Sequence, residues 1–527
     1  MSFFGQKFGQ NFGFGGGGLA LQSDPPSALG WTWASGISFF KNGSIYSSSF
    51  DITSLKPAVT TTYYVDPTGG NDGNSGLTRA LALKSLSVAI AKANVDQIII
   101  INLTADIVVR STVGWGAAAA PNRSFSVINE TPQFRYINAG ASGTVNNWTV
   151  NGTFPTVYQN ARSSAGIGVI DCRLKAWPFR LDVAGTGYAV NDTVTLPNGA
   201  ILKVLAIGGG GGIITYSYNL KPTSQVTGTM TQSATSGAGT GAQWVSITNA
   251  PPMYYVANKV ASIAAVNATA GTYFDDGTNV YYKPPDGAVL TGSQPKIVIA
   301  VATDTLRMGN FSNLTIYLQD IDIVGGQRGF YASMASVNTG SRYALNHCSF
   351  QGAGTDNGMS ILCTSTIYAK DCGAYFNTAD GYSFHSFEAD GTTTGTSPKS
   401  FLDSCIGQGN GTTGSAGTSD NDFTAHDDSD NILLNCIACG SADRVMAYVN
   451  KCRSWIMGGF CGAAAEVAAS KESISVQNTA KMFIDGIRVM PAASATEKYG
   501  ITSGAFLYYR NMSPVPTTGG AGTIAAY

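Results

Sequence analysis

Charge is scarce in this chain, and neither sign prevails. Only 12% of the 527 residues are charged, and 31 Lys and Arg residues stand against 32 Asp and Glu residues, so the formal net charge is −1. Proteins that bind nucleic acid or an anionic membrane surface through their overall field carry a clear basic excess. The composition therefore predicts no nucleic-acid partner.

Long apolar runs are missing as well. The sequence contains no stretch of about 18 apolar residues, which a membrane span would need. The N-terminus, MSFFGQKFGQ, has neither a continuous apolar segment nor a small-residue cleavage site, so it does not read as a secretory signal peptide. We therefore expect a protein that is made in the cytoplasm and leaves the cell, if at all, by lysis or a dedicated route.

Cysteine patterns of metal sites or disulfide frameworks are also lacking. The nine cysteines are odd in number and spread over a long chain, which predicts reduced thiols that pack as small apolar side chains. Cys436 and Cys439 form a C-x-x-C, but no second pair or metal-spaced histidine follows. We expect no bound cofactor from this pattern.

Glycine and small polar residues are abundant instead. The chain has 64 glycines, and Ser, Thr and Asn separate short apolar runs. This composition favours strands and turns over helices. A chain of this length exceeds one ordinary globular core, but a solenoid escapes that limit because each repeat buries its apolar face against its neighbours. We therefore expect an all-β solenoid.

The segment 1–60 differs from the rest of the chain. Phenylalanines alternate with glycines and end in a run of glycines; the residues are Phe3, Phe4, Phe8, Phe12, Phe14 and Gly15 to Gly18. Such a segment is not expected to build a core of its own. It is either an anchor whose phenylalanines fit pockets on a partner or a flexible, adhesive terminus.

A sequence segment with a recognisable order of elements begins at Thr62. A strand-like Tyr63-Tyr64-Val65 leads to the turn Asn71-Asp72-Gly73, a helical pattern from Leu83 to Ala93, and the apolar run Ile98 to Leu103. This phrase resembles the opening of right-handed parallel β-helix proteins of the pectate-lyase-like superfamily, in which the helix caps the first rung. The resemblance implies that fold, with Asp66 and Asp72 as turn residues.

Residues 180–250 are expected to form an insertion. Alternating apolar residues between glycine turns indicate a small antiparallel β-domain, and the segment resembles a module of phage tail fibres and virion-bound adhesins. Glycan contact and mere spacing both stay open as its role. After it, Gly271 to Tyr282 predicts a hairpin, because an Asp-Gly turn separates two aromatic strands.

Short repeats with a central cysteine follow between about Ile297 and Pro491. In most, a polar turn residue precedes the cysteine and an apolar position comes after it; the cysteines are Cys348, Cys372, Cys405, Cys436 and Cys452. The intervals between them are uneven, which fits rungs with loops of unequal length. We predict that the five cysteines stack in one interior ladder. The expected segments are 1–60 (anchor), 61–179 (cap and first rungs), 180–250 (insertion), 251–490 (main β-helix) and 491–527 (C-terminal tail).

Acidic residues gather in the same region. Residues 371–443 contain eleven acidic residues and one basic residue, Lys399. The phrases from Asp380 to Glu388 and from Asp420 to Asp427 each include a histidine. The stretch from Asp380 to Tyr448 resembles part of a group of phage-encoded β-helix proteins, which implies fold and context but no residue roles.

Paired carboxylates in this region suit glycosidic cleavage, in which one protonates the leaving oxygen and the other activates water or attacks the sugar. Glu388 is the candidate acid because flanking phenylalanines would raise its pKa. The candidates for the second carboxylate and for the imidazoles that position it are Asp380, Asp422, Asp427, His385 and His426. Alternatively, these residues only brace the corners of the solenoid.

A lyase is the other enzymatic alternative. It would pair Ca²⁺-binding aspartates with a base among Arg444, Lys451 and Arg453, although no calcium loop of the EF-hand type is present. The leading hypothesis is a homotrimeric phage tail spike that is located in the virion, docks to a tail or baseplate protein through its N-terminus, and binds and cleaves bacterial surface polysaccharide. A non-enzymatic receptor-binding or structural virion protein and a bacterial polysaccharide lyase, hydrolase or adhesin are the alternatives.

Overall fold

The computed structural model divides the chain into two compact units, Met1–Phe50 and Asp51–Tyr527. The residues that it describes are 20–22, 29, 31, 33–34, 36–92, 97–101, 107–109, 113–115, 124–130, 134–138, 148–161, 169–220, 226–285, 287–290, 297–299, 304–308, 312–333, 340–386, 397–411, 420–462, 472–490, 499–512, 516 and 520–527. The phenylalanines of the proposed anchor lie outside these ranges. Among the described residues, no helix has the length and hydropathy needed to cross a membrane.

The first unit contains a small antiparallel sheet. Its strands are β1 (Ala20–Gln22), β2 (Phe39–Asn42) and β3 (Ile45–Ser48), in that order. The turn between β2 and β3 begins at Gly43, whose φ of 60° suits a tight hairpin. The side chains of Phe39 and Tyr46 are buried. This hairpin lies within the stretch for which we expected no core of its own, and it contains two buried aromatic side chains.

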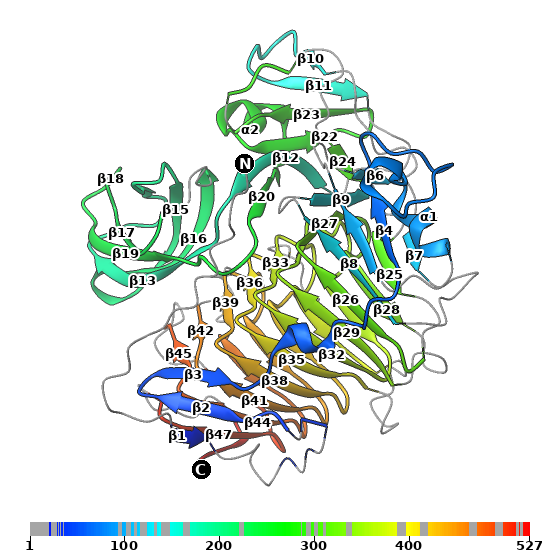
Figure 1. Cartoon of the computed structure of the whole chain (residues 1–527). Coiled ribbons are helices and arrows are strands. Elements are labelled where there is room, and N and C mark those ends of the chain that lie inside the picture. The colour runs from blue at the N-terminus through cyan, green and yellow to red at the C-terminus, as the bar shows by residue number, and fades with distance from the viewer. Residues whose placement is uncertain are drawn as a thin grey trace. The chain divides into compact units, whose positions relative to one another are not determined.

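The second unit is a parallel β-solenoid of about 11 turns, with three sheets that repeat in the order I, II, III along the chain (Figure 1). Sheet I consists of β4 (Thr62–Val65), β5 (Gln97–Ile100), β8 (Phe125–Asn129), β26 (Thr315–Gln319), β29 (Ser341–Asn346), β32 (Ser365–Lys370), β35 (Lys399–Asp403), β38 (Asp430–Leu434), β41 (Arg453–Met457), β44 (Lys481–Asp485), β47 (Phe506–Arg510) and β48 (Thr523–Ala526). One turn of the solenoid is called a rung below.

The other two sheets have nine strands each. Sheet II consists of β6 (Ile107–Val109), β9 (Phe134–Asn138), β27 (Ile321–Gly325), β30 (Ser349–Gln351), β33 (Gly373–Tyr375), β36 (Ile406–Gln408), β39 (Ile437–Cys439), β42 (Phe460–Cys461) and β45 (Arg488–Val489). Sheet III consists of β7 (Val113–Trp115), β25 (Leu306–Met308), β28 (Phe330–Ser333), β31 (Met359–Leu362), β34 (Tyr382–Phe384), β37 (Phe423–Ala425), β40 (Met446–Tyr448), β43 (Ile474–Val476) and β46 (Tyr499–Ile501). The expected parallel β-helix is therefore confirmed.

The described part of the chain contains two α-helices. Helix α1 (Leu86–Ala91) follows the short 3₁₀ helix η3 (Arg79–Leu81) and buries Leu86, Ala89 and Ile90 in the solenoid core. Asp72 accepts hydrogen bonds from the backbone N–H groups of Lys84 (2.9 Å) and Ser85 (2.7 Å), just ahead of the helix. The helix predicted between Leu83 and Ala93 is thus present, and Asp72 is the turn residue that we expected.

The cysteines form a ladder at the corner between sheets I and II. Cys348, Cys372, Cys405 and Cys436 are buried, and each follows a residue in the left-handed conformation. The thiols of three of them donate to a carbonyl of the preceding rung: Cys372 to Leu345 (3.2 Å), Cys405 to Ala369 (3.5 Å) and Cys436 to Leu402 (3.3 Å). All eight cysteines whose side chains are described are free thiols.

Cys452 does not belong to this ladder. It precedes β41, at the corner between sheets III and I, whereas the other four follow a strand of sheet I. The position that continues the ladder in the next rung is Gly459, because Ile437 pairs with Phe460. Our inclusion of Cys452 was wrong: the interval from Cys436 to Cys452 is too short for a rung of three strands and their corners.

The insertion consists of two antiparallel sheets. One contains β13 (Phe179–Thr186), β19 (Thr240–Ser246) and β17 (Thr229–Thr231); the other contains β16 (Ile213–Leu220), β15 (Ile201–Ile207), β14 (Thr193–Thr195) and β18 (Ala234–Thr235). The 3₁₀ helix η4 (Gly209–Gly211) lies between β15 and β16. The apolar core of the insertion includes Trp244 and also Phe460 and Met490 of the solenoid. The insertion therefore packs against sheet II.

Further strands form two sheets separate from the three solenoid sheets. A five-stranded sheet has the order β10 (Thr149–Val150), β11 (Tyr158–Ala161), β23 (Asn279–Lys283), β22 (Thr272–Asp275) and β21 (Asn258–Lys259), with α2 (Ile263–Ala268) against β22 and β23. The predicted hairpin is β22–β23. A three-stranded sheet has the order β20 (Met253–Val256), β12 (Val169–Ala176) and β24 (Ile297–Ile299), and η2 (Ile52–Leu55) lies against β29 and β32.

Candidate functional site

The predicted site residues that the structure describes lie along sheet III. Tyr382 pairs with Phe423 and Phe384 pairs with Ala425, so β34 and β37 are neighbours and the two acidic phrases stack in register. These four side chains point into the solenoid core. Because side chains alternate along a strand, Ser383, Thr424 and the histidines that follow each strand belong to the outward face.

His385 and His426 stack on each other on this face. Their ring centroids are 4.1 Å apart and the rings are nearly parallel, at 17°. Nε2 of His426 lies 3.1 Å from Oγ1 of Thr424. Burial and the neighbouring His426 lower the pKa of His385 to about 3, and burial also lowers the pKa of His426 against the opposing effect of Asp427. At neutral pH the pair is an uncharged, half-buried ring stack.

Asp427 braces the corner below this stack. It is buried and has a φ of 62°. Its Oδ2 accepts from the backbone N–H of Ser386 (2.8 Å), and its Oδ1 accepts from Nδ2 of Asn450 in the next rung (3.0 Å). The carboxylate thus joins three successive rungs at the corner between sheets III and I.

Asp380 has a similar place at the other edge of sheet III. Only 2% of the residue is exposed, and Oδ1 accepts from the backbone N–H (2.9 Å) and Nδ2 (3.0 Å) of Asn421. Burial raises the pKa of Asp380 well above its usual value despite these hydrogen bonds. Asn357 of the preceding rung accepts from the backbone N–H of Asp380 (2.9 Å), so this row continues across the rungs.

Asp422 is fully buried at the corner between sheets II and III. Its Oδ1 accepts from Nδ2 of Asn410 (2.7 Å), whose Oδ1 in turn accepts from Nδ2 of Asn377 (2.8 Å). Oδ2 of Asp422 has no hydrogen-bond partner among the described residues. Burial raises the pKa of this carboxyl to about 8, so it is protonated at neutral pH.

These environments favour the structural alternative for three of the predicted carboxyls. Asp380, Asp422 and Asp427 are buried and hold neighbouring rungs together, whereas a catalytic carboxyl must reach substrate or water. Glu388, the predicted acid, lies outside the described residues. A catalytic role for any of the six residues stays a prediction.

A row of charged residues lies at the edge of sheet III; from the sequence we considered its Arg444 only as a lyase base and did not single out Glu472. Arg444 and Glu472 stand two residues before β40 and β43, the same offset as Asp380 before β34. Nε of Arg444 donates to Oε2 of Glu472 (3.0 Å), and Nη1 donates to Oδ2 of Asp443 (2.9 Å). Arg444 and Glu472 are partly exposed, whereas Asp443 is buried. Alignment of the apolar strands by register would have revealed the row.

The same row contains a second arginine on an earlier rung. Nε of Arg328 lies 2.7 Å from Oδ1 of Asp304 and 3.7 Å from Oδ2 of Asp356, and its guanidinium carbon lies 3.3 Å from the ring centroid of Tyr331. Burial raises the pKa of Asp356, although Arg328 opposes this. Each of the two arginines is therefore shared by two carboxyl groups.

The basic residues considered for a lyase do not gather at one point. Arg444 lies at the edge of sheet III, whereas Arg453 is in sheet I and forms a two-point contact with Asp430 (Nε–Oδ1 2.7 Å, Nη2–Oδ2 2.8 Å). Lys451 lies at the corner between sheets III and I. Among the described residues, no group of three or more His, Cys, Asp or Glu side chains could hold a metal ion.

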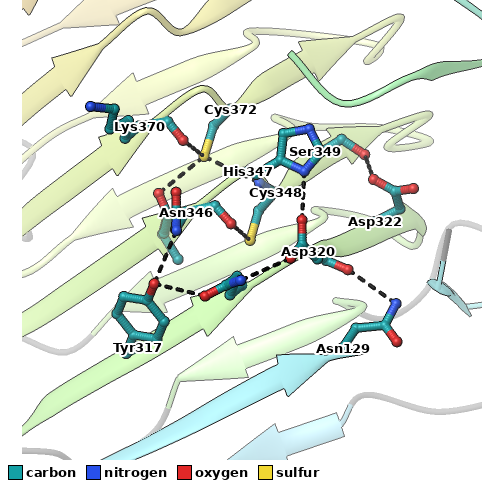
Figure 2. A network of polar contacts seen from close by, with 12 residues as sticks. Asn129, Tyr317, Asp320, Asp322, Asn346, His347, Cys348, Ser349, Lys370 and Cys372 are labelled. Carbon is teal, nitrogen blue, oxygen red and sulfur yellow. Dashed lines mark hydrogen bonds and ion pairs between the residues drawn. The ribbon is translucent and has the colours of Figure 1, made fainter. Parts of the chain in front are cut away.

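The third histidine, His347, belongs to a separate polar network at the corner between sheets I and II (Figure 2). Its Nδ1 lies 2.6 Å from Oδ1 of Asp320. Burial lowers the pKa of His347, but the hydrogen bond and charge of Asp320 outweigh it, so the pKa is raised. On the next rung, burial and the charge of Asp403 raise the pKa of Asp371 to about 6.

Comparisons with known proteins add little to this picture. No protein-family model matches the sequence, and no curated protein matches it. A solved structure described as "Glycoside hydrolase" has a TM-score of 0.44 at 10% identity, over 88% of this chain and 96% of that chain. Another, described as "The complex structure of XylC with xylose", has a TM-score of 0.32 at 10% identity, over 85% of this chain and 68% of that chain. Likenesses this distant do not indicate the ligand or the reaction of this chain.

Proposed function

We propose that this chain binds a bacterial surface polysaccharide along the outward face of sheet III and cleaves it, as part of a phage tail spike. The observation that carries the proposal is the half-buried His385–His426 stack, whose position the hydroxyl of Thr424 fixes from below. Uncharged rings offer flat surfaces to sugar rings. Arg444 and Glu472, partly exposed at the edge of the same sheet, can exchange hydrogen bonds with sugar hydroxyls.

A linear polymer suits such a surface because both repeat in one direction. Strands of neighbouring rungs lie about 4.8 Å apart, so equivalent positions recur along the solenoid at that interval. Small serines take the position of Thr424 on three other rungs, at Ser360, Ser383 and Ser475. All four side chains are buried, so in this proposal the polymer contacts the histidine rings and the partly exposed Arg444 and Glu472. This geometry supports binding of a polymer rather than of a small compact ligand.

Cleavage requires two carboxyl groups that reach the scissile bond. In our proposal Glu388 is the acid, as the sequence predicts. Glu472 suits the role of base better than Asp380 and Asp422, because its side chain is partly exposed and theirs are buried. The replacement Glu388→Gln should then abolish cleavage and preserve binding.

The direct test is to incubate the purified protein with polysaccharides extracted from candidate host strains. New reducing ends, the absorbance of unsaturated uronates and polymer size are followed over time. We expect the release of oligosaccharides from at least one polymer. If the protein neither binds nor shortens any polymer, including those of hosts that the phage infects, the proposal is wrong.

The double variant His385→Ala/His426→Ala tests where the polymer binds. Loss of the ring stack should weaken affinity at least tenfold, which corresponds to about 1.4 kcal/mol. The control is Arg342→Ala, which removes an exposed side chain from sheet I. Equal affinities of the two variants would place the binding surface elsewhere.

Binding without cleavage is the second candidate function. It is favoured by the burial of Asp380, Asp422 and Asp427, which leaves these carboxyls as corner braces. In that case the polymer would stay intact while it binds, and Glu388→Gln would change nothing. A bacterial lyase, hydrolase or adhesin without a virion is the remaining alternative.

We further propose that the N-terminal aromatic segment docks to a tail or baseplate protein and that the chain forms a homotrimer. The mass of one chain is 54.7 kDa, so light scattering during gel filtration should give three times that value. A monomer would contradict this assembly. Deletion of residues 1–18 should abolish capture by virion proteins and leave polysaccharide binding unchanged.

A further inference from the structure

The charged row at the edge of sheet III determines which polymers its outward face can accept. Arg444 donates to Asp443 on one side and to Glu472 on the other, at 2.9 and 3.0 Å. The charge of this guanidinium is already compensated by two carboxylates. The three groups together carry a net charge of about −1 when all are ionised, so they do not attract a second anion.

Arg328 is held in the same way. Asp304 lies 2.7 Å from its Nε, Asp356 approaches to 3.7 Å, and the face of Tyr331 covers the guanidinium. Ring and carboxyl groups thus occupy the surroundings of this arginine on the described part of the chain. Neither arginine of the row offers the open fork with which proteins bind the carboxylates of acidic ligands.

The other charged residues near this face do not make its net charge positive. Arg307 is exposed on β25 and lies 5.6 Å from the ring of Tyr331, and Lys451 is exposed at the corner with sheet I. The carboxyl groups of Asp420, Asp427 and Asp428, which flank β37, oppose these two positive charges. Among the described residues, the face therefore carries an excess of carboxyl groups.

We infer that the polymer bound along sheet III is uncharged, composed of neutral sugars without uronate, sialate or phosphate groups. This inference rests on the proposed function. An anionic polymer would place a negative charge on every repeat against the carboxyl groups, at separations where like charges repel. A neutral polymer avoids this cost, and its hydroxyls can bond to carboxylates and guanidinium edges alike.

The inference also decides between hydrolysis and elimination. A lyase removes the proton next to a uronate carboxylate, and a neutral sugar has no such acidified proton. Cleavage of a neutral polymer must then be hydrolysis: the bond from the anomeric carbon to the leaving oxygen breaks, the leaving oxygen takes a proton, and water supplies a hydroxyl to the anomeric carbon. Products would be reducing oligosaccharides without unsaturated uronate absorbance.

The test uses the full-length protein and the polysaccharide that binds it most tightly among the host extracts. Sugar analysis should find no uronate, sialate or phosphate, and the dissociation constant should change less than twofold between 50 and 500 mM NaCl, values we choose to span roughly a threefold change in Debye length. An acidic binding polymer would overturn the inference and leave the proposed function standing. Failure of every polymer to bind would instead overturn the proposed function itself.

A charge variant gives an independent readout. Asp443→Asn/Glu472→Gln removes two negative charges and releases Arg444, so the variant should gain at least tenfold affinity for an acidic polymer such as alginate. Carboxyl-reduced alginate is the matched uncharged probe and should show no gain. The control Glu130→Gln/Asp275→Asn removes the same charge away from sheet III. If the control gains as much as the variant, net charge rather than the row sets the preference.

Discussion

At the scale of single residues, the three histidines should titrate in separate ranges. Asp320 holds the pKa of His347 above its ordinary value, whereas burial places the pKa of His385 at about 3 and lowers that of His426. We expect the imidazole NMR signals to show one histidine protonated at pH 6.5 and two neutral. Three superimposed titrations near pH 6.5 would contradict the described environments.

The replacement Asp320→Asn assigns the upper titration. Asparagine tolerates the left-handed φ of 58° at this position, but it carries no charge to stabilise the imidazolium. The pKa of His347 should then fall, because only the charges of Asp322 and Asp371 remain to oppose the effect of burial. Since the raised pKa contributes stability below pH 6.5 and loses it as the pH rises through the folded-state value, the variant should be less stable than the native chain at pH 5.

Asp422 should make the protein less stable as the pH rises from about 4 to 8. The folded state keeps this carboxyl protonated, with a pKa of about 8, whereas the unfolded chain releases the proton near its ordinary pKa of 3.8. In that window the folded state binds more protons, so the free energy of unfolding falls by at most about 1.4 kcal/mol per pH unit from this group.

Asp422→Asn removes this dependence and preserves an acceptor for Asn410. Urea unfolding at pH 5 and pH 8 should show a smaller loss of stability for the variant than for the native chain. Asp275→Asn is the control, because Oδ1 of Asp275 accepts from the N–H of Gly277 in the turn of the β22–β23 hairpin. An unchanged pH profile in Asp422→Asn would mean that the carboxyl is ionised in the folded protein.

At the scale of elements, the corners between sheets I and II depend on close backbone contact. Gly459 lies at such a corner, whereas Gly440 follows β39 at the corner between sheets II and III; both have positive φ, 86° and 78° respectively. A Cβ on Gly459 would collide with the backbone of Cys436, whereas a Cβ on Gly440 would meet its nearest atom, the nitrogen of Gly409, at 3.9 Å. Gly459→Ala should therefore destabilise the protein by about 3 kcal/mol or more, and Gly440→Ala by about 1–2 kcal/mol.

Thermal unfolding measures this difference, and the shared positive φ makes Gly440→Ala a matched control. Equal losses in the two variants would show that backbone conformation alone sets the cost. The comparison would then contradict the role of Gly459 as the continuation of the cysteine ladder.

The ladder shows what the sequence could predict about elements. The run from Cys348 to Cys436 indicated stacked rungs correctly despite its uneven intervals, because a small residue that follows a left-handed corner recurs once per turn. Cys452 misled us because the corner between sheets III and I uses the same chemistry: Asn450 has a φ of 64° and a buried residue follows two positions later. Local sequence does not distinguish two corners of one rung.

The sequence indicated which region of the chain holds the candidate residues, but not how deeply each side chain is buried. The two acidic phrases lie on adjacent strands, and their histidines stack. Whether a carboxyl faces water depends on the path of the chain at each corner. Asp422 directly precedes an inward-facing phenylalanine and is nevertheless buried beside Asn410, which no local pattern revealed.

At the scale of the whole second unit, the insertion should protect sheet II rather than act as a detachable module. Gln408 donates to the carbonyl of Phe179 (3.1 Å), and Arg488 pairs with Asp182 (2.6 Å). The ends of the insertion meet, since the N–H of Ile247 donates to the carbonyl of Pro178 (2.9 Å). Excision of residues 179–246 with a short glycine linker is therefore feasible.

This excision should expose Phe460 and Met490, which the insertion core now covers. We expect aggregation or strong binding of a hydrophobic dye, together with a lower melting temperature. Asp182→Ala, which removes partly exposed ion pairs, should cost less than about 1 kcal/mol. A soluble excision variant with the native melting temperature would show that the insertion is an independent module.

The unequal rungs have a consequence for how such a protein can change over time. Successive strands of sheet II pair in register although the chain from Gly373 to its partner Ile406 is longer than the chain from Ser349 to its partner Gly373. The ladder therefore constrains the corners and leaves the length of the intervening chain free. Lineages of this protein could exchange whole loops while the corner residues that direct the stacking of the rungs stay the same.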